Sequence, residues 1–139
     1  MNTSRAIIAV VICIVQSLAM ISMAQTSSPL LNRIPKADPK KYQDVKDGAE
    51  WQNPKMFVRP EGIEVIGVTA RGQGVPAESV PEVLGRLPNS AWPYGLVVMV
   101  SDIGIMRSIQ DAPKIEANRK KLIRILRRHG IVVELWPSA

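Results

Sequence analysis

Gly95-Leu96-Val97-Val98-Met99-Val100-Ser101-Asp102 is the stretch of sequence that decides the predicted fold. Its first six residues form a continuous apolar run, bounded on one side by Trp92-Pro93-Tyr94 and on the other by Ser101-Asp102. The run is too short for a stable helix, and no polar residue alternates with the apolar ones. These properties predict a central strand that is covered on both faces of a sheet.

Upstream of this strand, the sequence predicts a β-hairpin. Met56–Arg59 and Ile63–Val68 lie on either side of Pro60-Glu61-Gly62. Proline presets the first dihedral angle of a tight turn, and glycine supplies the positive φ that closes it. Thr69–Val75 follows as a predicted mobile loop, whose glycines do not run directly into a helix and so do not indicate a dinucleotide-binding turn.

A short helix is predicted between the hairpin and the central strand. Ser79 and Glu82 have the spacing of a capping box, in which the serine accepts a hydrogen bond from the third helical amide. Four apolar residues at helical spacing share one face of this helix, and Pro88 ends it. They are Val80, Val83, Leu84 and Leu87.

A longer helix and a last strand are predicted after the central strand. Asp111 is expected to cap a helix that runs to about His129, with Gly130 at the C′ position. Ile131–Leu135 is then the final strand, which Trp136-Pro137 ends. The predicted order is β-β-α-β-α-β: an α+β domain with a mixed sheet of about four strands and two helices on one face. Both crossovers are expected to be parallel and right-handed.

Residues 1–24 are predicted to be a signal peptide. One positive charge precedes an apolar run from Ala6 to Val15, and Ser22 and Ala24 occupy the small-residue positions of a signal-peptidase site. Cleavage near Ala24 would leave the mature chain in the periplasm or outside the cell. The alternative is an uncleaved inner-membrane anchor, because Ala6–Ala24 carries no charge and nearly reaches the ~20 residues that cross a bilayer.

The remaining chain divides into a predicted linker and one domain. Residues 25–54 are rich in serine, proline, lysine and aspartate, with apolar residues at no helical or strand period, which predicts a flexible linker. Trp51 is expected to dock on the domain, residues 55–139. Cys13 is the only cysteine, so the chain after Ala24 has no thiol for a disulfide, a metal site or a nucleophile.

Aromatic side chains mark two predicted strand ends. Trp92 and Tyr94 precede the central strand, and Trp136 follows the last one. Large rings at such positions are expected to close the core. An exposed aromatic ledge is the alternative interpretation.

No catalytic motif is present in the sequence. The single histidine, His129, lies at a predicted helix C-terminus, where it is expected to cap the last carbonyls rather than to act in catalysis. Asp102 is the best candidate for a functional group, because it follows a buried strand at the end where βα loops carry binding residues. Its alternative role is to cap the turn 101–104. We therefore expect a protein without enzymatic activity, cofactor or metal.

The longer helix is strongly asymmetric in charge. Between Lys114 and Arg128 there are seven basic residues and one acidic, a net charge of +6, whereas the rest of the chain from Gln25 onward has a net charge of −1. At 100° per residue, the basic residues lie opposite the apolar face. This face is a candidate docking surface for an envelope protein or an anionic membrane, with a plain solvated surface as the alternative. Its candidate binding residues are Lys120, Lys121, Arg124, Arg127 and Arg128.

The sequence resembles the ExbD/TolR family of energy-coupling proteins. The resemblance is carried by Ile63–Gly67, by Val75–Leu87 as the first helix, by Gly95–Asp102 and by Lys121–Leu135 as helix, glycine and terminal strand. It implies a periplasmic domain on an N-terminal membrane anchor, partnered with a proton-channel subunit through a transmembrane aspartate. The apolar segment of this chain has no acidic residue, which argues against proton coupling.

Two function classes follow. The first is a small exported, non-enzymatic binding or accessory domain that docks through the basic helix. The second is an anchored, ExbD/TolR-like scaffold component of an envelope complex. Export makes nucleic acid an unexpected partner in either case. A chain that begins at Gln25 in its native host would exclude the anchored form.

Overall fold

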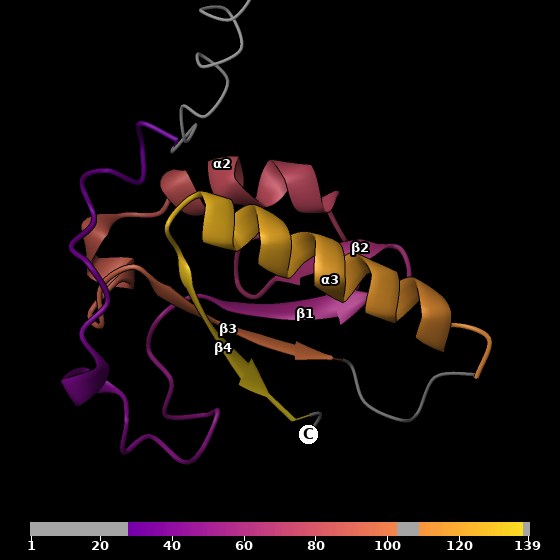
Figure 1. The fold of residues 1–139 in the computed structure, drawn as a ribbon, viewed down its shortest axis with the longest axis horizontal. Helices are drawn as coiled ribbons and strands as arrows, with labels where there is room; N and C mark the ends of the chain where they lie inside the picture. Colours follow the sequence, from indigo (N-terminus) through magenta and orange to yellow (C-terminus); the bar gives the residue numbers. More distant parts are fainter. Residues whose placement is uncertain (1–27, 103–108, 138–139) are drawn as a thin grey trace, which may run out of the picture.

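The computed structural model describes residues 28–102 and 109–137 (Figure 1). The expectations for residues 1–24 and for the turn after Asp102 concern residues outside these ranges. The strands are β1 (Lys55–Arg59), β2 (Gly62–Val65), β3 (Val97–Asp102) and β4 (Val132–Trp136), and the α-helices are α2 (Val80–Gly85) and α3 (Ala112–Arg128). Three short 3-10 helices are η1 (Pro39–Lys41), η2 (Ala77–Ser79) and η3 (Asn89–Ala91).

The four strands form one mixed sheet in the order β2-β1-β3-β4. β1 pairs antiparallel with β2 and parallel with β3, and β3 pairs parallel with β4. The α+β class, the hairpin and the central position of β3 are therefore confirmed. The hairpin's second strand is shorter than predicted and ends at Val65.

One of the two predicted parallel crossovers is wrong. β3 bypasses β2 and pairs with β1, so β2 and β3 run antiparallel and only β3-α3-β4 is a parallel crossover. The outer edge of β2 is already occupied, since Val75 returns to pair with Ile63 through two hydrogen bonds of 2.8 Å. The free edge of β1 is thus the one that accepts β3.

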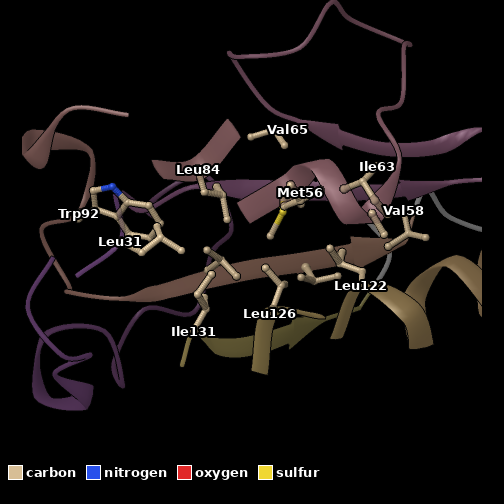
Figure 2. Close-up of a cluster of buried hydrophobic side chains, with 14 of the residues drawn as sticks. Leu31, Met56, Val58, Ile63, Val65, Leu84, Trp92, Leu122, Leu126 and Ile131 are labelled. Carbon is tan, nitrogen blue, oxygen red and sulfur yellow. The ribbon is translucent and has the colours of Figure 1, made fainter. Parts of the chain in front are cut away.

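The main hydrophobic core lies between the sheet and its two helices. Met56 and Val58 of β1 and Val98 and Val100 of β3 point to this side, because successive strand residues alternate between faces. Leu84 of α2 and Leu122 and Leu126 of α3 are fully buried against them (Figure 2). Both helices lie on the same side of the sheet, as predicted (Figure 1).

The expectation of a flexible linker over residues 25–54 is wrong for its described part, residues 28–54. Leu31 and Ile34 are buried in the main core, and Tyr42 and Trp51 are buried in a second core cluster with Tyr94, Val97 and Met99. This segment covers the face of β3 that points away from the helices. Each apolar residue packs singly from an irregular chain, so no hydrophobic period reveals the packing. Trp51 docks as predicted, with 3% of its surface exposed.

The helix termini follow the predictions in part. Gly130 adopts a positive φ of 72° after α3, as the predicted C′ glycine requires. Asp111 occupies the N-cap position, but the predicted cap is wrong, because its backbone is helical and its side chain makes no cap hydrogen bond. The capping box at Ser79 is wrong: its side chain makes no cap hydrogen bond, because η2 leads into α2 and gives Ser79 helical dihedral angles. Glu82 pairs with Arg86 one turn later.

Candidate functional site

The exposed face of α3 gathers the predicted basic residues. Lys120, Arg124, Arg127 and Arg128 line a shallow hollow of about 650 Å³ together with the half-buried Ile123. We refer to these five residues as the basic face. It lies opposite Leu122 and Leu126, which hold the helix on the sheet. The helical period therefore placed these four basic residues on one surface, as expected.

The hairpin helps to position α3. Asn118 donates from Nδ2 to the backbone oxygens of Arg59 at 2.8 Å and of Pro60 at 3.2 Å. These bonds fix the first half of the helix over the β1–β2 turn. The second half, which carries the basic face, continues from this clamp to Gly130.

The basic residues of α3 differ in whether an acidic partner offsets their charge. Glu116 pairs with Arg119 and lies 3.5 Å from the Nζ of Lys120. Within residues 28–102 and 109–137, no carboxylate forms an ion pair with Arg124, Arg127 or Arg128, whose side chains are exposed to solvent. Among the described residues, the basic face thus carries three positive charges without an ion-pair partner.

Lys121 does not join the basic face. Its Nζ forms an ion pair with Glu78, the middle residue of η2, which ties α3 to the residues before α2. The hydrogen bond from Lys121 is the largest cause that lowers the pKa of Glu78. Sequence periodicity could not foresee this partner, because Glu78 belongs to another element.

Asp102 lies apart from the basic face. It is the last residue of β3, and its backbone is in register with Val58 of β1. Its side chain is outside the described part of the chain. Its predicted functional role stays a prediction.

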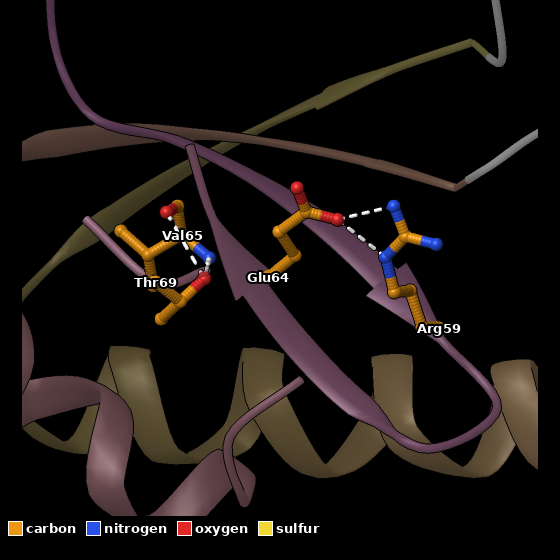
Figure 3. A network of polar contacts seen from close by, with 4 residues as sticks. All are labelled: Arg59, Glu64, Val65 and Thr69. Carbon is orange, nitrogen blue, oxygen red and sulfur yellow. Dashed lines mark hydrogen bonds and ion pairs between the residues drawn. The ribbon is translucent and has the colours of Figure 1, made fainter. Parts of the chain in front are cut away.

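A second hollow, of about 490 Å³, lies beside the hairpin. Phe57, Arg59, Glu64, Ile66 and Arg71 are among its lining residues, and no tryptophan belongs to its described lining. Arg59 donates to the carboxylate of Glu64, which is only 4% exposed (Figure 3).

The end of β2 beside this hollow is held by Thr69. Its Oγ1 accepts from the backbone N–H of Val65 at 3.1 Å and donates to the oxygen of Val65 at 3.2 Å (Figure 3). These bonds and the Arg59–Glu64 pair are internal to the hairpin and its following turn. They occupy one carboxylate oxygen of Glu64 and the hydroxyl of Thr69.

A third hollow, of about 410 Å³, lies on the sheet face opposite the helices. Tyr42, Val45, Trp51, Glu134 and Trp136 line it together with Pro39 and Gln43. The rings of Tyr42 and Trp51 are 5.4 Å apart, and those of Trp51 and Trp136 are 6.1 Å apart. Residues 42, 51 and 136 are too far apart in sequence for a local motif to connect them.

His129 acts at the end of α3 as a structural residue. Its backbone N–H donates to the oxygen of Leu126 at 3.0 Å, and its Nδ1 accepts from the N–H of Ser28 at 3.2 Å. The side chain therefore contacts the N-terminal segment rather than the helix carbonyls. In the described part of the chain, no three potential ligand side chains converge as a metal site. None of the described helices is long and apolar enough to span a membrane.

None of the protein-family models, curated proteins and solved structures compared with this chain matches it.

Proposed function

We propose that this protein is an exported, non-enzymatic accessory domain that docks on an anionic membrane surface through the basic face of α3. The observation that supports the proposal is the row of Arg124, Arg127 and Arg128, exposed and without an acidic partner among the described residues. A plain solvated helix would more often intersperse both signs of charge on this surface.

The dimensions of the basic face fit a lipid surface. Lys120 and Arg128 are separated by eight residues, which is about 12 Å along a helix axis. Each cation near an anionic membrane contributes about 1 kcal/mol, so the three arginines without an ion-pair partner among the described residues give weak, reversible binding. Ile123, half-buried between the cations, adds an apolar contact at the headgroup boundary.

Export supports a membrane rather than a nucleic acid as the partner. The apolar run Ala6–Val15 and the small residues Ser22 and Ala24 indicate a secreted chain. Such a chain meets phospholipid headgroups on the far side of the membrane it crosses. We therefore favour anionic phospholipid headgroups as the surface that binds α3.

Vesicle co-sedimentation tests the proposal. The protein beginning at Gln25 keeps every described residue of both core clusters and lacks the segment that would insert by itself. We expect it to bind vesicles of phosphatidylglycerol and phosphatidylcholine, and to bind phosphatidylcholine alone poorly. Raising the salt concentration should release it, because exposed charges are screened.

Two charge-reversal variants distinguish the basic face from net charge. Arg124→Glu, Arg127→Glu and Arg128→Glu together should weaken binding more than about tenfold, since each reversal removes an attraction and adds a repulsion. The matched control reverses Lys36, Lys40 and Lys46, which are exposed on the N-terminal segment. Equal losses in the two variants, equal binding to neutral vesicles, or a preference for duplex DNA would contradict the proposal.

A second candidate function is a membrane-anchored scaffold component similar to ExbD/TolR proteins. It is favoured by the element order β1-β2-α2-β3-α3-β4, which agrees with the order on which the sequence resemblance rests. The intact mass of the protein from its native host separates the candidates. A mass that begins at Gln25 excludes the anchored form, whereas an intact residue 1–24 segment in the membrane fraction supports it.

A further inference from the structure

The third hollow is walled by aromatic rings at steep angles to one another. The planes of Tyr42 and Trp51 are inclined at 69°, and those of Trp51 and Trp136 at 64°. Tyr42 directly follows η1, Trp51 precedes β1, and Trp136 ends β4. Three separate parts of the chain thus contribute aromatic rings to the lining of one hollow, in which Tyr42 and Trp51 are buried and Trp136 is half-buried.

One acidic residue completes the lining of this hollow. Glu134 of β4 is half-buried there and is the only charged side chain among the described lining residues. No described residue forms an ion pair with it. Burial, followed by the negative charges of Glu134 and Asp38, raises the pKa of the Tyr42 hydroxyl. Glu134 is therefore the charged group that the described lining offers to a ligand.

We propose that this aromatic pocket, lined by Tyr42, Trp51, Trp136 and Glu134, binds a soluble organic cation with a trimethylammonium-type head. Ring faces attract a cation through their negative quadrupole, and indole is the strongest of the natural rings in this respect. The carboxylate of Glu134 supplies the opposite charge. The volume of about 410 Å³ accommodates a molecule of the size of choline.

Other ligand classes fit the lining less well. A small anion would face the carboxylate of Glu134 without a described cation in the lining. A metal ion would find a single carboxylate where several ligands are needed. A purely apolar molecule would leave Glu134 partly desolvated and uncompensated. An organic cation satisfies the rings and the carboxylate together.

The position of the pocket favours a free cation over a lipid headgroup. Trp51 and Tyr42 belong to the core cluster on the sheet face that points away from α2 and α3. The basic face lies on the far side of α3, so the two surfaces point in different directions. The pocket proposal is independent of membrane docking and is tested separately.

A nitrogen-15 NMR titration with choline chloride, at constant ionic strength, tests the pocket. The protein beginning at Gln25 has three indole N–H signals, from Trp51, Trp92 and Trp136. We expect choline to shift the Trp51 and Trp136 signals saturably. Trp92 lies in the other core cluster and serves as the internal control, whose signal should not move.

Two comparisons isolate the role of charge. The Glu134→Gln variant and the neutral choline isostere 3,3-dimethylbutan-1-ol should each lower affinity by about fivefold or more, because each removes one member of the charge pair. Glu82→Gln removes the same charge from an exposed site on α2 and should leave affinity unchanged. An unmoved Trp92 signal in Glu134→Gln shows that the fold is retained.

The outcomes decide the proposal. The absence of saturable shifts, equal binding of the neutral isostere, or an unchanged affinity in Glu134→Gln would overturn it. Phosphatidylcholine vesicles form a separate arm. Shifts of the tryptophan signals with soluble choline but not with vesicles support a free cation as the ligand. Shifts with vesicles alone would overturn the proposal that the ligand is a soluble cation.

Discussion

The Oδ1 of Asn53 accepts a hydrogen bond of 2.9 Å from the backbone N–H of Tyr94, across 41 residues of sequence. The Nδ2 of the same side chain donates to the oxygens of Gly95 and Val97, both at 2.7 Å. Asn53 is 3% exposed, so these three bonds replace water completely. The side-chain amide of Asn53, two residues before β1, thus links the chain that enters β1 to the chain that enters β3. Because β1 and β3 are parallel, this link lies where both strands begin.

Asn53→Ala is expected to destabilise the protein strongly. The substitution removes three hydrogen bonds, for a cost of about 3 kcal/mol or more. The buried N–H of Tyr94 and the oxygen of Val97 lose their bonds to Asn53, whereas the oxygen of Gly95 still accepts from the N–H of Val97 at 2.8 Å. Urea unfolding followed by circular dichroism measures this. Gln52→Ala, at the exposed neighbouring position, is the control and should change stability by less than about 0.5 kcal/mol.

Gly95 and Gly130 provide a second, matched comparison. Both have positive φ, of 80° and 72°, so alanine costs roughly 1–2 kcal/mol at either position. A Cβ at Gly95 would also lie 2.2 Å from the backbone oxygen of Lys36, whereas nothing lies within 4 Å at Gly130. We therefore expect Gly95→Ala to lower the free energy of unfolding well beyond Gly130→Ala. Equal losses of unfolding free energy in the two variants would contradict this prediction. They would mean that the backbone around Lys36 shifts without cost to make room for the Cβ.

The strands and helices were predictable wherever one residue pattern decides the packing. The apolar run 97–100 can only be buried on both faces, and the period of α3 separates Leu122 and Leu126 from the arginines. Four of the five basic residues therefore fell on one surface as expected. Lys121 was the exception, because the position of Glu78 depends on how η2 packs.

The remaining features depend on contacts between distant residues. Leu31 and Tyr42 are isolated apolar residues in a polar context, so their burial has no periodic signal. The strand order depends on Val75 occupying the β2 edge, which hydropathy does not encode. The aromatic pocket combines residues from opposite ends of the domain. Its one sequence signal is the excess of tryptophan over phenylalanine, three to one.

The Glu78–Lys121 pair predicts a pH dependence on the acidic side. The pKa of Glu78 is lowered in the folded state, chiefly by the hydrogen bond from Lys121, so its contribution is present above the ordinary glutamate pKa. That contribution is lost as the pH falls below about 4 and Glu78 becomes protonated. Glu78→Gln should therefore lower stability near neutral pH and reduce the loss on acidification. Thermal unfolding across this range measures both effects, which are small because Glu78 is exposed.

Leu31 tests whether the segment before β1 belongs to the folding unit. Leu31 is 1% exposed in the main core, whereas its neighbour Leu30 is 45% exposed. Leu31→Ala should cost about 2–5 kcal/mol, the range for a buried leucine, and Leu30→Ala less than about 1 kcal/mol. Both free-energy changes are measured from the midpoints of urea unfolding, with the dependence of the free energy on urea concentration unchanged. If the folded domain began at Lys55, neither substitution would change the free energy of unfolding. Similar small effects of both would therefore support the interpretation of this segment as a linker. A large loss confined to Leu31→Ala requires that folding include residues from at least Leu31 onward, and hence that a chain starting at Lys55 is incomplete.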